Sequence, residues 1–235
     1  MPRTQFNHLA RPYRWLEYLT FGPMLARCRF HRISELTHAR RALVLGDGDG
    51  RFLARLLAAN PMLQADVVDQ SPAMLRLLQA RIEALGAADR VRIYETDALA
   101  FRPAESAAYD LVITHFFLDC FTTEQVCELA RNIQPSLVPG ALWIISEFSI
   151  PRGLAALPAW MIVRSLYFAF RILTGLRVRA LPVHAAGLTQ AGLTLRDRQT
   201  FLFGLLISET WAATSPSRFE EGEATRPCPC PSQPA

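Results

Sequence analysis

The residues whose types and spacing best fit ligand binding are three alternating glycines, Gly46, Gly48 and Gly50, and an aspartate further along the chain, Asp69. Gly46, Gly48 and Gly50 lie between a short apolar run, Ala42 to Leu45, and a segment with helical apolar periodicity that begins at Phe52. Glycine is needed where the backbone takes a positive φ or where a ligand lies against the main chain. The stretch therefore predicts a buried strand, a tight turn and a helix whose first amides point at a ligand.

The spacing of these glycines argues against a dinucleotide. A pyrophosphate loop has the pattern GxGxxG, but counting from Gly46 and Gly48 the third position is Arg51. The pattern here is GxGxG, which resembles motif I of the class I S-adenosylmethionine (SAM)-dependent methyltransferases.

Four further segments are similar to motifs of that family and follow in the family's order. They are Val67 to Leu75, Glu95 to Ala98, Tyr109 to Thr114 and Pro135 to Leu142. The resemblance covers residues 40–148. It implies an α/β fold with a Rossmann-like, mostly parallel sheet of seven strands that ends in an antiparallel pair and is flanked by helices. It also implies SAM as the cofactor. Outside this core, the chain is loosely similar to the ubiquinone and menaquinone biosynthesis methyltransferases.

The resemblance also implies a set of cofactor-binding residues. They are Gly46, Asp47, Gly48, Gly50, Asp69, Gln70, Met74, Asp97, Ala98 and Thr114. Asp69 ends the predicted second strand, and its two carboxylate oxygens suit two ribose hydroxyls. Family members usually carry an acidic residue two positions before the first glycine, where this chain has Val44. Asp47 or Asp49 is the alternative source of that charge, although Asp49 also suits a turn.

Candidate catalytic residues follow the predicted fourth strand. Transfer of a methyl group from a sulfonium requires alignment of the acceptor and, for a protic acceptor, removal of a proton. His115 is a candidate general base because its reference pKa is near neutral; hydrogen bonding to the cofactor or the fold is the alternative. Asp119 is a second candidate. The neighbouring phenylalanines, Phe116, Phe117 and Phe121, fit either an apolar acceptor site or the core.

The amino-acid composition excludes several classes of functional site. The 235 residues are 51% hydrophobic with a net charge of +4, which favours one core with an elaboration. The chain contains no lysine, which excludes a P-loop or a lysine Schiff base. Its five scattered cysteines indicate a reducing compartment and no metal site. The sequence shows no secretory signal and no span of sufficient apolar length. We therefore expect a cytoplasmic protein, and we expect no nucleic-acid partner.

The pattern divides the chain into five segments. They are an N-terminal helical cap (1–41), a SAM-binding core (42–150), a helical insertion or lid (151–181), a closing helix and strands (182–213) and a disordered tail (214–235). The closing strands are predicted at Leu193 to Arg196 and Phe201 to Ile207. Residues 157–176 are apolar but carry arginines, so this helix could pack in the protein, cover an apolar acceptor or lie at a membrane surface.

The leading functional hypothesis is a SAM-dependent methyltransferase for a small, apolar or aromatic acceptor. One alternative is an aminopropyl transferase, because the glycine turn also resembles that of the spermidine synthases. Another is a non-catalytic SAM- or nucleotide-binding module at a membrane surface. The sequence does not indicate an oligomeric state.

Overall fold

The computed structural model describes residues 23–153, 156–174, 178 and 180–214. Most of the predicted N-terminal cap and nearly all of the predicted disordered tail lie outside the described residues. The division of the chain into five segments stays a prediction.

A single seven-stranded sheet organises the described chain, in the order β3-β2-β1-β4-β5-β7-β6. The strands are β1 (Arg41–Leu45), β2 (Gln64–Asp69), β3 (Val91–Glu95), β4 (Tyr109–His115), β5 (Leu137–Phe148), β6 (Leu193–Phe201) and β7 (Leu206–Ala213). Strands β1 to β5 pair in parallel, whereas β7 is antiparallel to both β5 and β6. This arrangement confirms the predicted fold class.

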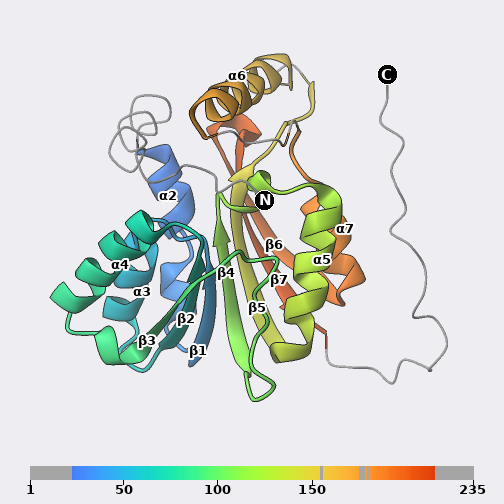
Figure 1. Cartoon of the computed structure of the whole chain (residues 1–235). Helices are drawn as coiled ribbons and strands as arrows, with labels where there is room; N and C mark the ends of the chain where they lie inside the picture. Colours follow the sequence, from blue (N-terminus) through green and yellow to red (C-terminus); the bar gives the residue numbers. More distant parts are fainter. Residues whose placement is uncertain (1–22, 154–155, 175–177, 179, 215–235) are drawn as a thin grey trace.

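Helices cover both faces of the sheet and the carboxyl ends of its parallel strands (Figure 1). They are α2 (Met24–Phe30), α3 (Arg51–Ala59), α4 (Pro72–Ala84), α5 (Thr123–Ile133), α6 (Ala156–Thr174) and α7 (His184–Gln190). Helices α3 and α4 lie on one face, and α5 and α7 on the other; α2 and α6 lie at the end where β4 and β5 finish (Figure 1). The site expected at that end is therefore bordered by helices.

The alternation of side chains along β1 explains the two-sided core. Leu43 and Leu45 belong to a cluster with residues of α5, whereas Ala42 and Val44 belong to a cluster with residues of α3. Successive side chains of a strand point to opposite faces, so an entirely apolar strand must be covered on both sides. This packing holds the end of β1, and with it the glycine turn, at the centre of the sheet.

Local sequence signals start the helices that border this end. The Ser71 side chain accepts a hydrogen bond from the Met74 amide at the start of α4, and Pro72 occupies the first turn. Thr122 and Gln125 form a capping box at the start of α5. Each helix therefore begins at a fixed residue just beyond a strand end.

The two closing strands, β6 and β7, form as predicted, but their predicted bounds are wrong. Residues 197–200, which separate the two predicted strands, continue β6, and the chain turns instead at the 3₁₀ helix η7 (Leu202–Gly204). Strand β6 is one of the two outer strands of the sheet, and among the described strands it pairs with β7 alone. An edge strand accommodates exposed polar residues on both faces, so alternation of apolar residues is a weak signal there.

Candidate cofactor and acceptor site

The glycine turn after β1 is built so that part of its main chain is open. Gly46, Gly48 and Gly50 all adopt positive φ angles, of 65°, 64° and 77°. A Cβ atom at Gly46 would lie 2.0 Å from Cδ2 of Phe117, and one at Gly50 would lie 2.7 Å from Cγ of Leu78. A Cβ atom at Gly48 would meet no atom of the described residues within 4 Å. Gly46 and Gly50 are therefore required for packing, whereas Gly48 leaves main chain open to a ligand.

Asp69, the last residue of β2, lies beside this open main chain. Its Oδ1 accepts a hydrogen bond from the Ser71 amide at 2.8 Å, and the amides of Gly48 and Gln70 also act on the carboxyl group. Burial raises the pKa of Asp69 to about 6, against the opposing effect of these amides. A carboxylate next to the open main chain at Gly48 fits the hydroxyls of a ribose that lies on that turn.

The loop after β3 is tied to the same edge of the sheet. The Thr96 amide donates a hydrogen bond to the carbonyl oxygen of Asp69 at 3.1 Å. Asp97 follows Thr96, and its Oδ1 accepts a hydrogen bond from the Leu99 amide at 3.0 Å. The next residue, Ala98, is buried. The structure therefore brings Asp97 and Ala98, two of the predicted cofactor-binding residues, next to the end of β2.

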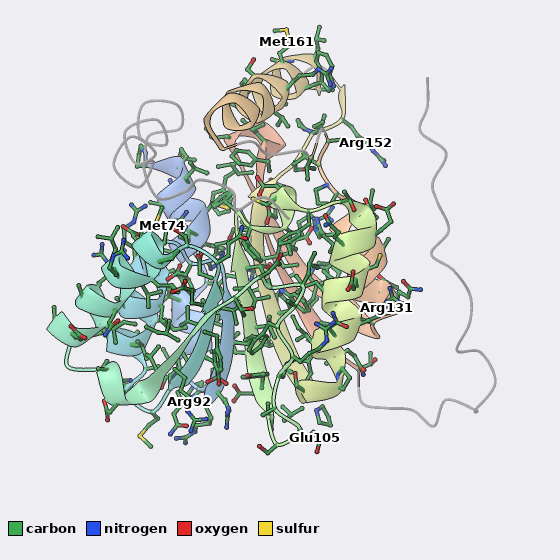
Figure 2. All side chains as sticks on the ribbon, viewed as in Figure 1. Met74, Arg92, Glu105, Arg131, Arg152 and Met161 are labelled. Atoms are coloured by element: carbon green, nitrogen blue, oxygen red, sulfur yellow. The ribbon has the colours of Figure 1, made fainter. Side chains whose placement is uncertain are left out.

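Gln70 and Met74 come from the segment that starts α4. Gln70 is exposed between Asp69 and the helix cap, and Met74 is partly buried in the first turn. Met74 lies at the same end of the molecule as α2 (Figure 2). Both residues are placed along the edge that carries Asp69.

The two aspartates of the glycine turn have different surroundings. Oδ1 of Asp49 accepts a hydrogen bond from Nε of Arg51 at 2.9 Å, and its Oδ2 lies 3.2 Å from Nη2 of Arg81. Asp47 is buried, and its Oδ2 accepts a hydrogen bond from the Leu53 amide at 3.0 Å. Burial raises the pKa of Asp47 to about 7. Asp49 is thus held by arginines, which leaves Asp47 as the better candidate for the cofactor's amino group.

Because Asp47 is buried, we expect the free energy of unfolding to depend on pH. Its pKa is higher in the folded protein than its ordinary value of 3.8, so between these pH values the folded state binds more protons and stability falls as pH rises. We expect Asp47→Asn to stabilise the protein at pH 8 by about 1 kcal/mol or more, which raises Tm by about 2–4 °C per kcal/mol. Thermal unfolding at pH 5 and pH 8 measures this.

The gain from Asp47→Asn should be smaller at pH 5, where the wild-type carboxyl is already largely protonated. Asp49→Asn is the matched control, because Asp49 is paired with two arginines and its replacement should not stabilise at either pH. An equal effect of Asp47→Asn at both pH values would contradict the assignment.

Thr114 and His115, at the end of β4, point to opposite faces of the sheet. Oγ1 of Thr114 accepts a hydrogen bond from Nε1 of Trp143 at 3.1 Å. The His115 ring packs against the Phe52 ring, with 4.3 Å between the ring centroids. Within the described part of the chain neither ring nitrogen of His115 has a hydrogen-bond partner. Burial, together with the Arg29 charge, holds the pKa of His115 well below its usual 6.5, so the ring is neutral.

Asp119 lies in the short 3₁₀ helix η4 (Leu118–Cys120) that follows β4. Its Oδ1 is 3.6 Å from Sγ of Cys120, and burial raises the pKa of Asp119 to about 6. A second acidic residue, Glu147, lies at this corner and was not among the predicted site residues; its Oε1 accepts hydrogen bonds from the amides of Phe117 and Leu118. Glu147 lies near the end of the largely apolar strand β5. An acidic residue at that position is the one feature of the sequence that could have indicated a role for it.

Comparison with known proteins agrees with this geometry. Residues 43–143 match a family model described as a methyltransferase domain. No curated protein sequence matches the chain. Its fold is similar to that of an O-methyltransferase family protein from Burkholderia thailandensis, with a TM-score of 0.67 and 21% identity over 92% of this chain and 64% of that one.

Two further solved structures share the fold. The mitomycin 7-O-methyltransferase MmcR matches with a TM-score of 0.66 and 19% identity, over 89% of this chain and 60% of that one. An N-methyltransferase, NodS from Bradyrhizobium japonicum, solved with S-adenosyl-L-homocysteine, matches with a TM-score of 0.60 and 16% identity, over 81% of this chain and 88% of that one. The chain thus spans about three-fifths of the length of the first two structures.

The sheet order is that of the class I SAM-dependent methyltransferase fold, and residues 43–143 of this sheet match a methyltransferase domain. Methyltransferase domains of this family use S-adenosylmethionine as their cofactor. The open main chain at Gly48 and the adjacent Asp69 carboxyl fit its nucleoside.

Proposed function

We propose that this chain is a methyltransferase that moves a methyl group from SAM to a small, apolar or aromatic acceptor. The observation that carries the proposal is the open glycine turn with the Asp69 carboxyl beside it, inside the matched methyltransferase domain. A nucleophilic atom of the acceptor forms a bond to the methyl carbon while the carbon–sulfur bond breaks. The electron pair of that bond stays on sulfur, which leaves neutral S-adenosylhomocysteine, and a protic acceptor loses its proton.

The surroundings of the strand ends support an apolar acceptor. Leu25 of α2, Phe148 of β5 and two buried residues of α6, Ala159 and Val163, form one apolar cluster, and Phe116 packs against it. These residues come from the elements that border the carboxyl ends of β4 and β5 (Figure 1). An acceptor that enters from this side would meet mostly hydrocarbon, with α6 as its cover.

Transfer of a labelled methyl group tests the proposed function. The purified protein is incubated with methyl-labelled SAM and a small-molecule extract, and Asp69→Ala serves as the control. Label in a small apolar product that depends on Asp69 supports the proposal. SAM binding with no transfer to any pool favours a non-catalytic module, and product formation from decarboxylated SAM and a polyamine favours the aminopropyl transferase.

His115 and Asp119 remain our candidates for the proton-accepting group. If His115 acts as the base, His115→Ala is expected to slow transfer by about 10²-fold or more while SAM affinity stays the same. Because the pKa of His115 is well below its usual value, its protonation should not limit the rate between pH 6 and 8. Steady-state kinetics and SAM titration measure both effects. Unchanged activity would assign His115 to packing against Phe52.

We further propose that α6 contacts the surface of a membrane. Outside the packed Ala159 and Val163, the helix exposes Trp160 and Met161, which are 47% and 53% accessible. Met161 points away from the sheet at the end of the molecule that also carries Arg152 (Figure 2). Residues 149–196 contain arginine at positions 152, 164, 171, 177, 179 and 196 and no acidic residue. An exposed apolar face in a stretch of sequence that is rich in arginine and lacks acidic residues suits anionic lipid headgroups.

Vesicle sedimentation tests this contact. We expect binding to phosphatidylglycerol vesicles that weakens with salt and is lost in Met161→Ser, whereas Met62→Ser, at an equally exposed position elsewhere, should bind as wild type. No vesicle binding would exclude the contact. None of the described helices has the length and apolarity that crossing a membrane requires.

A further inference from the structure

A buried carboxyl group at the end of β5 holds the corner that follows β4. Glu147 is 2% exposed, and its Oε1 accepts hydrogen bonds from the amides of Phe117, at 3.0 Å, and Leu118, at 2.8 Å. The preceding amide, that of Phe116, donates instead to the carbonyl oxygen of Ser146 at 2.7 Å. The pairing of β4 with β5 therefore ends at Phe116, and the Glu147 side chain takes over as acceptor for the next two amides.

This corner needs such support because its backbone is strained. Phe116 has a φ of 52°, a conformation that residues with a side chain rarely adopt. Phe117 precedes η4, whose first amides have no acceptor within their own helical turn. A carboxyl group supplied by the neighbouring strand meets that need, so Glu147 acts as a cap for η4 from outside its own segment.

The corner at Phe116–Leu118 also contacts the glycine turn that is proposed to bind the cofactor. The Phe117 ring lies so close to Gly46 that a Cβ atom there would be 2.0 Å from the ring. The Gly46 amide donates to the carbonyl oxygen of Val68, next to Asp69, at 3.0 Å. A continuous set of contacts therefore runs from Glu147 through Phe117 to the first glycine of the turn and to the strand that carries Asp69.

We propose that Glu147 is a positioning residue for SAM binding, which fixes the Phe116–Leu118 corner so that the Phe117 ring closes against Gly46. The proposal rests on SAM being the cofactor of this domain. Glu147 acts through Phe117 and is not assigned a contact with the reacting atoms.

The surroundings of Glu147 indicate which part of its carboxyl group matters. Burial and the nearby Asp119 carboxylate raise the pKa of Glu147 well above its ordinary value. Its second oxygen, Oε2, is buried and has no hydrogen-bond partner among the described residues. The required feature is then one acceptor oxygen at the correct reach, which the glutamine side chain also supplies.

Three variants test the proposal by SAM titration calorimetry. Glu147→Leu removes the acceptor and is expected to raise the Kd for SAM at least tenfold. Glu147→Gln keeps the acceptor and should stay within threefold of wild type. Asp66→Ala removes a buried carboxyl group of β2 that accepts the Tyr109 hydroxyl at 2.6 Å. This control should lower Tm but leave the Kd for SAM unchanged, which separates positioning from general loss of stability.

Amide hydrogen exchange gives a second readout that does not require the leucine variant to fold. The amides of Phe117 and Leu118 should exchange slowly in the wild-type protein and in Glu147→Gln. Wild-type SAM affinity in Glu147→Leu, fast exchange of the two amides in the wild type, or an affinity in Glu147→Gln as weak as in Glu147→Leu would each overturn the proposal. If the wild type itself failed to bind SAM, the cofactor assignment would fail, while slow exchange would still report the cap.

Discussion

Replacing Asp69 by alanine is expected to weaken SAM binding by about 1–3 kcal/mol, which is a rise of about 5- to 150-fold in Kd. The Asp69 carboxyl lies at the end of β2 beside the open main chain at Gly48, where it can accept hydrogen bonds from both ribose hydroxyls. Alanine removes both acceptor oxygens and the charge. Isothermal titration with SAM at pH 7.5 measures the change.

Two companion variants make the result specific. Glu95→Ala removes an exposed carboxylate from the residue that pairs with Asp69 on the neighbouring strand, and it should bind SAM as wild type. Asp69→Asn keeps one acceptor oxygen and should lie between wild type and alanine. Unchanged affinity in Asp69→Ala would mean that the ribose lies elsewhere.

The raised pKa of Asp69 also predicts how SAM binding depends on pH. With a pKa of about 6, the carboxyl is charged at pH 7.5 and mostly protonated at pH 5. A protonated carboxyl is a poorer acceptor, so SAM should bind more weakly at pH 5 than at pH 7.5. The part of this dependence that comes from Asp69 should disappear in Asp69→Asn.

The sheet could be predicted from the sequence because its signals are local. Each inner strand is a short apolar run, and the glycines, Pro72 and the Thr122–Gln125 capping box set the turns and helix starts within a few residues. Strand β6 was misjudged at its polar residues 197–200, because an edge strand has only one neighbour and carries little apolar pattern.

The candidate site likewise contains residues that local sequence signals indicate and residues that only the folded arrangement brings together. The glycine turn and Asp69 could be proposed as cofactor-binding residues from the sequence because they form a motif with fixed spacing. Glu147 could not be found, since it acts on amides 30 and 29 residues away that only the pairing of β4 with β5 brings close. The orientation of His115 toward Phe52 likewise follows from strand register and from a helix that lies earlier in the chain.

Gly46→Ala is expected to have the second large effect, on both folding and SAM binding. Gly46 has a φ of 65°, where a residue with a Cβ atom costs about 1–2 kcal/mol. The new methyl group would also lie 2.0 Å from Cδ2 of Phe117, so the ring must move. Displacing that ring disturbs the turn on which the cofactor lies. We expect a loss of about 2 kcal/mol or more in unfolding free energy and at least a tenfold rise in the Kd for SAM.

A double-mutant cycle separates the two causes. Phe117→Ala removes the ring that the new methyl group would meet, but leaves the φ angle of residue 46 unchanged. If the clash dominates, Gly46→Ala should cost clearly less in the Phe117→Ala background than in the wild type, with a coupling of about 1 kcal/mol or more. Denaturant unfolding and SAM titration of the four proteins measure it. Gly48→Ala is the matched control, because its Cβ atom would meet no atom within 4 Å in the described part of the chain. This variant should keep the strain of a positive φ and show no coupling to Phe117. Equal costs of Gly46→Ala in both backgrounds would show that the backbone angle, and not the contact with Phe117, is what requires glycine at this position.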